Sequence, residues 1–308
     1  MENNPLNNLR KLAEEAKKAG VVIPVTDGLF GNRKQERQES EVVSLEEAER
    51  IFEKDFLGPK AVEAVFGVSF SKESVVPIPF SKEELENAKS LGQQLIFQTD
   101  VMKIDEGPFD PEFDTVTSKN LKKVFLVEGD ENSMLNNQGW YENEEFFSEK
   151  IPRPCWKLTS KDIVPNSTSK NYLEQTEMLV SYIQNEIFRG IELPKEYAEA
   201  VLEFEEEKAA IAERMKGGNW GDASQWLADL KITKLTRETP VEAMYRLVLQ
   251  EKTDQEKLFS AKYAWTSRRA SGGGIVGVGQ FGSGAAGFIS DPPHHSYSDL
   301  GVFFSRMK

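Results

Sequence analysis

The side chains best suited to chemistry lie close together near the C-terminal end of the chain. His294 and His295 are its only histidines, and Asp291 and Asp299 lie on either side of them. Imidazole and carboxylate groups can ligate a metal ion or transfer a proton. Adjacent residues of an extended segment point to opposite sides, so this pair is poorly arranged to share one ion. We therefore expect exposed loop histidines and no metal site.

A second candidate is the spacing Gly277-x-Gly279-x-x-Gly282, which follows the apolar pair Ile275-Val276. This spacing is that of the dinucleotide-binding fingerprint, whose glycines lead from a strand into a helix. Here the next residues are Ser-Gly-Ala-Ala-Gly, and a double proline follows after four more residues, so the sequence does not favour a helix. We predict neither nucleotide binding nor any other cofactor.

The remaining reactive groups give no catalytic arrangement. Cys155 is the only cysteine, so the chain has neither a disulfide framework nor a thiolate metal site. It lies among strand-forming residues, which favours a buried structural thiol over a nucleophile. The carboxylates of residues 203–207 are typical of a solvated helix face. No Ser/His/Asp arrangement is evident, and we expect a protein that is not an enzyme.

Composition excludes two classes of partner. The net charge of −13 and pI near 4.9 argue against nucleic-acid binding, which needs a basic face. No apolar run approaches the roughly 20 residues that span a bilayer. The polar N-terminal residues lack the apolar core of a signal peptide. With 39% hydrophobic residues, the chain is expected to be globular and cytoplasmic.

These candidates need a scaffold of helices and strands. Two capping boxes, which begin at Ser44 and Ser81, predict helices that start there. The full set of expected helices is 4–19, 44–56, 81–91, 170–188, 194–215, 219–230 and 240–251. Expected strands are 21–25, 94–102, 123–127, 155–158 and 162–164, and residues from Leu258 onward have a β pattern. The class is therefore α+β.

The segment from Ala270 to Phe304 differs in composition from the rest of the chain. It holds nine of the 22 glycines, both histidines and only two charged residues. Glycine and serine leave its backbone weakly specified by local propensity. Such a segment either presents a ligand-binding surface or packs as a structural loop.

The residues around this segment resemble the C-terminal end of the variable proteins of diversity-generating retroelements. The similarity lies in YAWTSR at 263–268, VGQF at 278–281 and LGVFFSR at 300–306. Upstream stretches at 78–93, 164–177 and 235–247 are also similar to prokaryotic members, so the resemblance covers about 78–308. In that family a reverse transcriptase copies a template with errors at adenines, and the copy replaces the variable region.

That mechanism leaves a trace in composition. An AAC codon mutated at both adenines never encodes Lys, Glu, Met, Trp or Gln. These five types make up 88 of the 308 residues, yet between Ala270 and Phe304 only Gln280 belongs to them. A Gly/Ser-rich loop is also poor in Lys and Glu, but depletion confined to this segment is what the mechanism predicts.

The resemblance implies a C-type lectin fold, with two helices packed on a mainly antiparallel sheet in residues 77–308. Residues 1–76 are then an N-terminal helical extension, and the variable region is about 270–304. Its expected function is binding of a ligand, most simply a protein, through the variable face. The implied scaffold positions are Val276, Val278, Gly279, Phe281, Pro293, Leu300, Gly301 and Val302. The implied ligand-facing positions are Gly274, Gly277, Gln280, Gly282, Ile289, Ser290, Asp291, His294, His295, Tyr297, Ser298 and Asp299.

Two alternatives stay open. A structural or assembly protein would use the glycine-rich segment to pack against a partner subunit. An enzyme on a formylglycine-generating-enzyme-like lectin scaffold would need reactive cysteines or a metal site, and a single cysteine fits that poorly.

Overall fold

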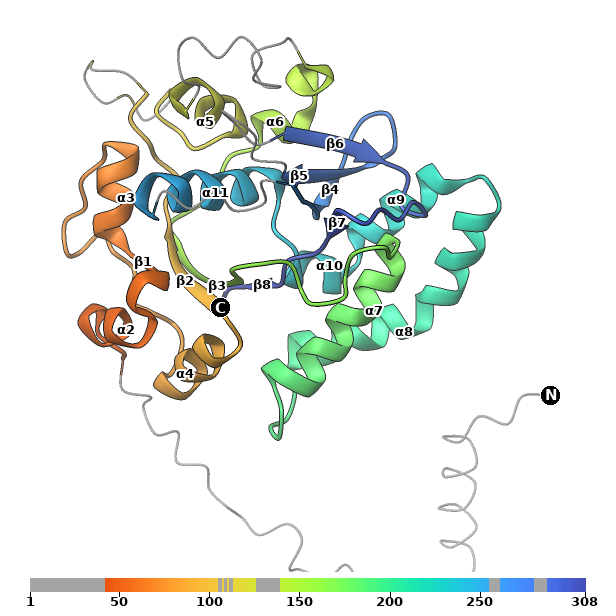
Figure 1. The fold of residues 1–308 in the computed structure, drawn as a ribbon, viewed down its shortest axis with the longest axis horizontal. Coiled ribbons are helices and arrows are strands. Elements are labelled where there is room, and N and C mark those ends of the chain that lie inside the picture. The colour runs from red at the N-terminus through yellow and green to blue at the C-terminus, as the bar shows by residue number, and fades with distance from the viewer. Residues whose placement is uncertain are drawn as a thin grey trace, which may run out of the picture. The chain divides into compact units, whose positions relative to one another are not determined.

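The computed structural model describes residues 42–104, 107, 110, 113–125, 139–254, 261–279 and 287–308. Helices and strands are mixed along these residues, and the strands form two four-stranded sheets (Figure 1). The α+β class predicted from the sequence is therefore confirmed. The expected helix at 4–19 and the expected strand at 21–25 lie outside the described residues.

The first sheet brings the end of the chain beside its middle. Its strand order is β1 (Phe56–Leu57), β2 (Gln93–Gln98), β3 (Cys155–Ser160) and β8 (Ser305–Arg306). β1 runs parallel to β2, whereas β2–β3 and β3–β8 are antiparallel. The predicted strands at 94–102 and 155–158 correspond to β2 and β3.

The second sheet is built entirely from the C-terminal region. Its order is β6 (Gly287–Asp291), β5 (Ile275–Gly279), β4 (Tyr263–Arg269) and β7 (Leu300–Gly301). β5 is antiparallel to both neighbours, and β7 runs parallel to β4. The segment that is unusual in the sequence therefore supplies three of these four strands.

The helices begin where side chains can cap them. Ser44 accepts a hydrogen bond from the Glu47 amide at 3.1 Å and starts α2 (Leu45–Phe52). Ser81 forms a complete capping box with Glu84 and starts α4 (Lys82–Ser90). Only the first half of the predicted box at Ser44 is present, because the Glu47 carboxylate pairs with Lys82 at 2.8 Å.

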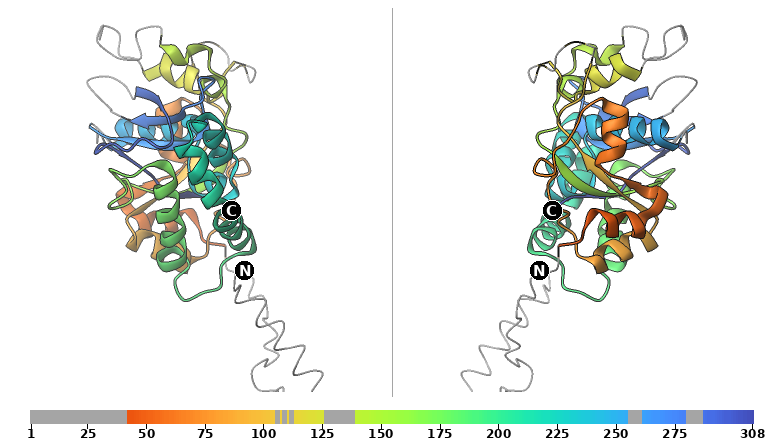
Figure 2. Two further views of the ribbon diagram at one scale, coloured as in Figure 1. Left: turned by 90° about the vertical axis from the view of Figure 1, so that its right-hand side faces the viewer. Right: turned by 90° about the vertical axis from the view of Figure 1, so that its left-hand side faces the viewer.

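Most of the other helices follow the β3 strand. Their bounds are α7 (Tyr172–Tyr182), the π-helical η3 (Ile183–Ile187), α8 (Lys195–Lys216), α9 (Trp220–Asp229), α10 (Lys231–Thr236) and α11 (Pro240–Asp254). α7, α8 and α9 face the viewer in the left-hand view of Figure 2. α11 packs against α5 and α3 and also against β4 and β5. It thereby links the region of the first sheet to the second sheet.

Two predicted strands are wrong. Residues 118–125 form helix α5 (Ser118–Phe125) where a strand was expected over 123–127, and residues 126 and 127 lie outside the described part. The Thr117 hydroxyl accepts the Asn120 amide at 3.0 Å, so a capped first turn overrides the β propensity of the apolar run. The expected strand at 162–164 is also absent: residue 162 is a bend, residues 163 and 164 are irregular, and a turn follows at 165–166, where the Ser167 amide bonds the Val164 carbonyl. A single backbone hydrogen bond joins this segment to the end of the chain, from the Val164 amide to the Val302 carbonyl.

Residues 42–76, part of the expected N-terminal extension, pack into the same core as the residues that follow. Phe52 of α2 and Phe66 of α3 (Pro59–Phe66) are buried in one hydrophobic cluster with Leu95 and Trp156. A second cluster joins α7–α10 to the second sheet around Trp265. Two short helical segments, η2 (Trp140–Asn143) and α6 (Glu145–Ser148), pack on Phe288 of β6 through Tyr141, Phe146 and Phe147. The 3₁₀ turn η1 (Glu53–Asp55) follows α2.

Candidate functional site

The twelve positions expected to face a ligand divide into three groups by exposure, with two positions outside the described residues. Gly274 and Gly277 are buried; Ile289, Ser290, Asp291 and His295 are half-buried; His294, Tyr297, Ser298 and Asp299 are exposed; Gln280 and Gly282 lie outside the described part. The exposed positions all belong to the eight residues between β6 and β7. We call residues 292–299 the display loop.

The two buried glycines do not face outward as expected. A Cβ atom at Gly274 would lie 2.5 Å from the Ser290 Oγ and 2.9 Å from the Asp291 amide nitrogen. A Cβ atom at Gly277 would lie 2.7 Å from the Ile289 Cγ1, because the two residues are partners across β5 and β6. These positions have no room for a side chain that reaches a ligand, and their role is close packing of the sheet.

The same pairing explains the glycine pattern that resembles a nucleotide fingerprint. Gly277 and Gly279 lie inside β5, hydrogen-bonded between β4 and β6. The dinucleotide motif needs its glycines at a turn that opens a helix. The backbone around Gly279 instead approaches Lys262 and Tyr263 so closely that a Cβ atom would collide with both.

Polar side chains of the display loop contact one another and Asp291, the last residue of β6. The Tyr297 hydroxyl lies 2.9 Å from the His295 Nδ1 and donates to the Asp291 Oδ1 at 3.1 Å. The His295 Nδ1 is itself 3.3 Å from that oxygen. The His294 and His295 rings meet edge to face, with centroids 4.7 Å apart. An aromatic ring, two imidazoles and a carboxylate are thus gathered on one exposed surface.

The backbone of the display loop is fixed by hydrogen bonds to the neighbouring scaffold. The Tyr172 amide, in the first turn of α7, donates to the Pro293 carbonyl at 3.0 Å, and the Ser169 amide donates to the Tyr297 carbonyl at 2.8 Å. The Tyr263 amide at the start of β4 donates to the Asp299 carbonyl at 2.7 Å. The loop can therefore present its side chains without ordering its backbone on binding, which lowers the entropic cost of association.

The scaffold positions implied by the resemblance are inside the fold. Val276, Val278, Gly279, Pro293, Leu300, Gly301 and Val302 are all buried, and Phe281 lies outside the described residues. Gly301 is tightly enclosed, since a Cβ atom there would lie 2.8 Å from the Ile163 Cδ1 and 2.9 Å from the Ser167 Oγ.

A cavity of about 530 Å³ lies beside the display loop. His294 forms part of its wall, and the rest comes from α7, α8 and the start of α9, chiefly Leu173, Met215 and Trp220. Its size falls in the range of roughly 300–1,000 Å³ that is usual for ligand sites, and its lining is partly apolar. The sequence analysis did not single out these helical residues for the site. The available signal was Trp220, which comes two residues after the helix-breaking pair Gly217-Gly218.

His294 is expected to be neutral near pH 7. Partial burial of its ring, and then the adjacent His295, lower the pKa of His294. The folded protein therefore takes up this proton less readily than the unfolded chain, so a small part of the stability is lost as the pH falls below about 6.5. An NMR titration of the ring proton, assigned with the His295→Asn variant, should give a midpoint below that of free histidine. A midpoint above that value would contradict the packing described for His294.

The other reactive groups are not gathered into a centre. Cys155 is half-buried, its thiol lies 3.7 Å from the Gln98 Oε1, and burial raises its pKa, which disfavours the thiolate. Within the described ranges, no three His, Cys, Asp or Glu side chains are grouped as a metal site would require. Every helix in that part of the chain is too short or too polar to span a bilayer.

Comparisons with protein-family models, with curated proteins and with solved structures gave no match. The geometry of the chain itself therefore carries the functional argument.

Proposed function

We propose that this chain is a binding protein without enzymatic activity, which recognises a ligand, most simply a protein, through the display loop and the cavity beside His294. The observation that carries the proposal is that one short segment combines exposed side chains with a hydrogen-bonded backbone and a buried flanking strand. Exposed His294, Tyr297, Ser298 and Asp299 lie on a backbone whose carbonyls bond α7 and β4, and the flanking Leu300–Gly301 strand is buried.

We further propose that the scaffold is a C-type lectin fold and that the display loop belongs to the variable region of a diversity-generating retroelement. The near absence of Lys, Glu, Met, Trp and Gln from residues 270–304 supports this assignment. The ligand-facing set that we propose is the half-buried and exposed positions 289–291, 294, 295 and 297–299, and burial of Gly274 and Gly277 is the reason for leaving those two out. Side-chain variation in that set leaves the sheet pairing of β5 intact.

The chain's own packing weighs against the assembly alternative. Val302, Phe303 and Phe304 are buried against residues of the same chain, and β8 pairs with β3. A C-terminal segment that packs within its own fold leaves little apolar surface for a partner subunit.

A binding selection tests the proposal. A library randomised at His294, His295, Tyr297 and Ser298, displayed on yeast, should yield binders to several unrelated protein targets. Replacing an aromatic residue of a selected binder by Ala should weaken its binding about tenfold or more, as for buried anchor residues of other interfaces. The matched control is a library at four exposed α8 residues, Glu205, Glu206, Ala209 and Ala210. If the α8 library gives binders as often as the loop library, the display loop has no special role.

A further inference from the structure

A buried arginine in this acidic protein lacks an acidic partner among the described residues. Arg237 follows α10, and its side chain is 4% exposed. Its Nη2 donates to the Tyr172 carbonyl at 3.3 Å and to the Thr176 hydroxyl at 3.1 Å, and the guanidinium lies 3.8 Å from the centre of the Tyr172 ring. Its Nε and Nη1 have no acceptor among the described residues. Burying a guanidinium with two unsatisfied donors is costly unless an anion is bound there.

Arg237 lines a cavity of about 430 Å³ in which another donor is also unsatisfied. Ser305 of β8 lies in the same wall, is 4% exposed, and its hydroxyl has no partner in the described part of the chain. The neighbouring Arg306 side chain points to the other face of the strand, where it lies over the Phe80 and Phe188 rings and pairs with Glu84. Three unsatisfied polar atoms from two buried residues, Arg237 and Ser305, therefore belong to one cavity.

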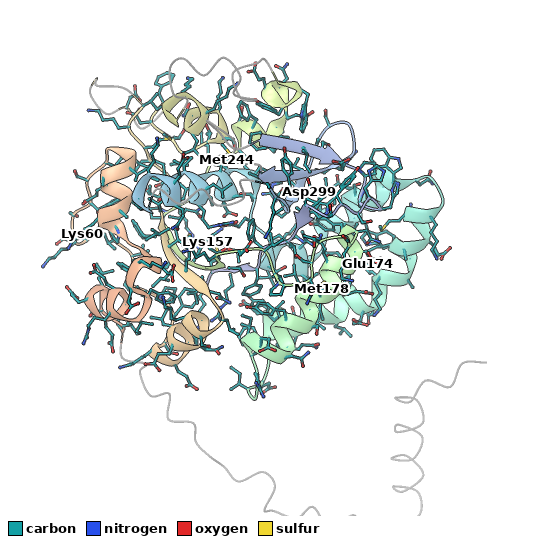
Figure 3. The ribbon with its side chains drawn as sticks, in the orientation of Figure 1. Lys60, Lys157, Glu174, Met178, Met244 and Asp299 are labelled. Atoms are coloured by element: carbon teal, nitrogen blue, oxygen red, sulfur yellow. The ribbon has the colours of Figure 1, made fainter. Side chains whose placement is uncertain are left out.

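The charges around this cavity have the opposite sign to those of the whole protein. Six basic residues line it, namely Lys150, Lys157, Lys234, Arg237, Arg268 and Arg306, of which Lys234 pairs with Asp229 and Arg306 with Glu84 outside the cavity. Only two acidic side chains line it, and both are already paired, Glu242 with Lys157 and Glu149 with Arg268. Lys157, labelled in Figure 3, projects from β3 into the interior. A basic cavity in a chain of net charge −13 attracts a small anion and excludes acidic protein surfaces.

We propose that this cavity binds a small molecule through an oxyanion group, either a phosphate or a carboxylate. Arg237 and Ser305 supply N–H and O–H donors, which are the groups that recognise such anions. The cavity has the volume of a small-molecule site, and Ile151, Leu235 and Met307 give its wall an apolar part. None of its lining residues belongs to the display loop, so this site is separate from the proposed binding surface.

Isothermal titration and thermal unfolding with two probes test the site. Sodium phosphate and sodium succinate are each compared with sodium chloride at equal ionic strength and pH. A ligand that binds only the folded state raises the melting temperature with its concentration. A rise with phosphate alone identifies a phosphate group, a rise with succinate alone identifies a carboxylate, and a rise with both supports a general oxyanion site. No rise with either probe overturns the proposal.

Substitutions of cavity residues show whether the probe binds in the cavity around Arg237. Arg237→Met should weaken binding of the active probe at least tenfold, and the exposed control Arg189→Met should leave it unchanged. An equal response in Arg237→Met and the wild type overturns the assignment even when the probe binds. If Arg237→Met does not fold, Ser305→Ala decides: a severalfold loss of affinity supports the site, and unchanged affinity rejects it. The selection at the display loop is read out separately, so either proposal can fail alone.

Discussion

Replacing Glu238 by Gln should lower the free energy of unfolding by about 3–5 kcal/mol, because it leaves a buried arginine without its counter-ion. Arg246 of α11 and Glu238 have side chains only 1% and 4% exposed. The Arg246 Nε donates to both carboxylate oxygens of Glu238, and the Arg246 Nη2 donates to one of them, at distances of 2.8–3.1 Å. The Glu238 carbonyl also accepts the Ser267 amide of β4 at 2.9 Å, so the pair connects α11 to the second sheet.

Urea unfolding followed by circular dichroism measures this loss. The control is Glu213→Gln, which breaks the exposed Glu213–Lys216 pair of α8 and should cost less than about 1 kcal/mol. The double variant Glu238→Leu/Arg246→Met should recover much of the lost stability, since no uncompensated buried charge remains. Equal losses in Glu238→Gln and Glu213→Gln would show that the buried pair does not hold α11 in place.

Trp265→Ala should cost about 3–5 kcal/mol and also loosen the display loop. Trp265 lies in β4, is 2% exposed and meets the Tyr172 ring edge to face at 5.8 Å. Tyr172 in turn bonds the Pro293 carbonyl through its amide and the Thr266 carbonyl through its hydroxyl. A cavity at Trp265 therefore removes packing beneath the residue that anchors the loop.

Unfolding and hydrogen exchange together test this coupling. In Trp265→Ala, the amides of Ser169 and Tyr172, which donate to loop carbonyls, should exchange faster than in the wild type. Trp140→Ala is the control, because that side chain is 47% exposed and its loss should cost about 1 kcal/mol or less. Lost stability with unchanged exchange at Ser169 and Tyr172 would show that the loop is held independently of Trp265.

The elements that sequence could predict are those with local causes. Helices α2 and α4 start at the predicted caps because the Ser–Glu spacing acts within one turn. β2 and β3 were predictable from their strand-forming residues, Leu95–Phe97 in β2 and Trp156 and Leu158 in β3. The strand expected over 123–127 is wrong at residues 123–125, because Thr117, outside the apolar run, caps a helix that includes these residues.

The site was predictable only in part, because exposure depends on pairing between distant residues. Gly274 and Gly277 are buried because β5 pairs with β6, which brings Ser290 and Ile289 against them, and a glycine-rich sequence specifies this register weakly. The cavity beside His294 combines residues from α7, α8 and α9, which no local pattern connects to the loop. The basic cavity around Arg237 likewise joins residues that are far apart in sequence.

Deep sequencing of this locus in its source population tests the central claim most directly. If the display loop is a diversified binding surface, amino-acid replacements should gather at His294, His295, Tyr297, Ser298 and Asp299. Leu300, Gly301 and Val302 should stay fixed, since they are buried and Gly301 has no space for a Cβ atom. A loop that is uniform, or that varies only at silent sites, would contradict the account and leave the segment as a structural element of the second sheet.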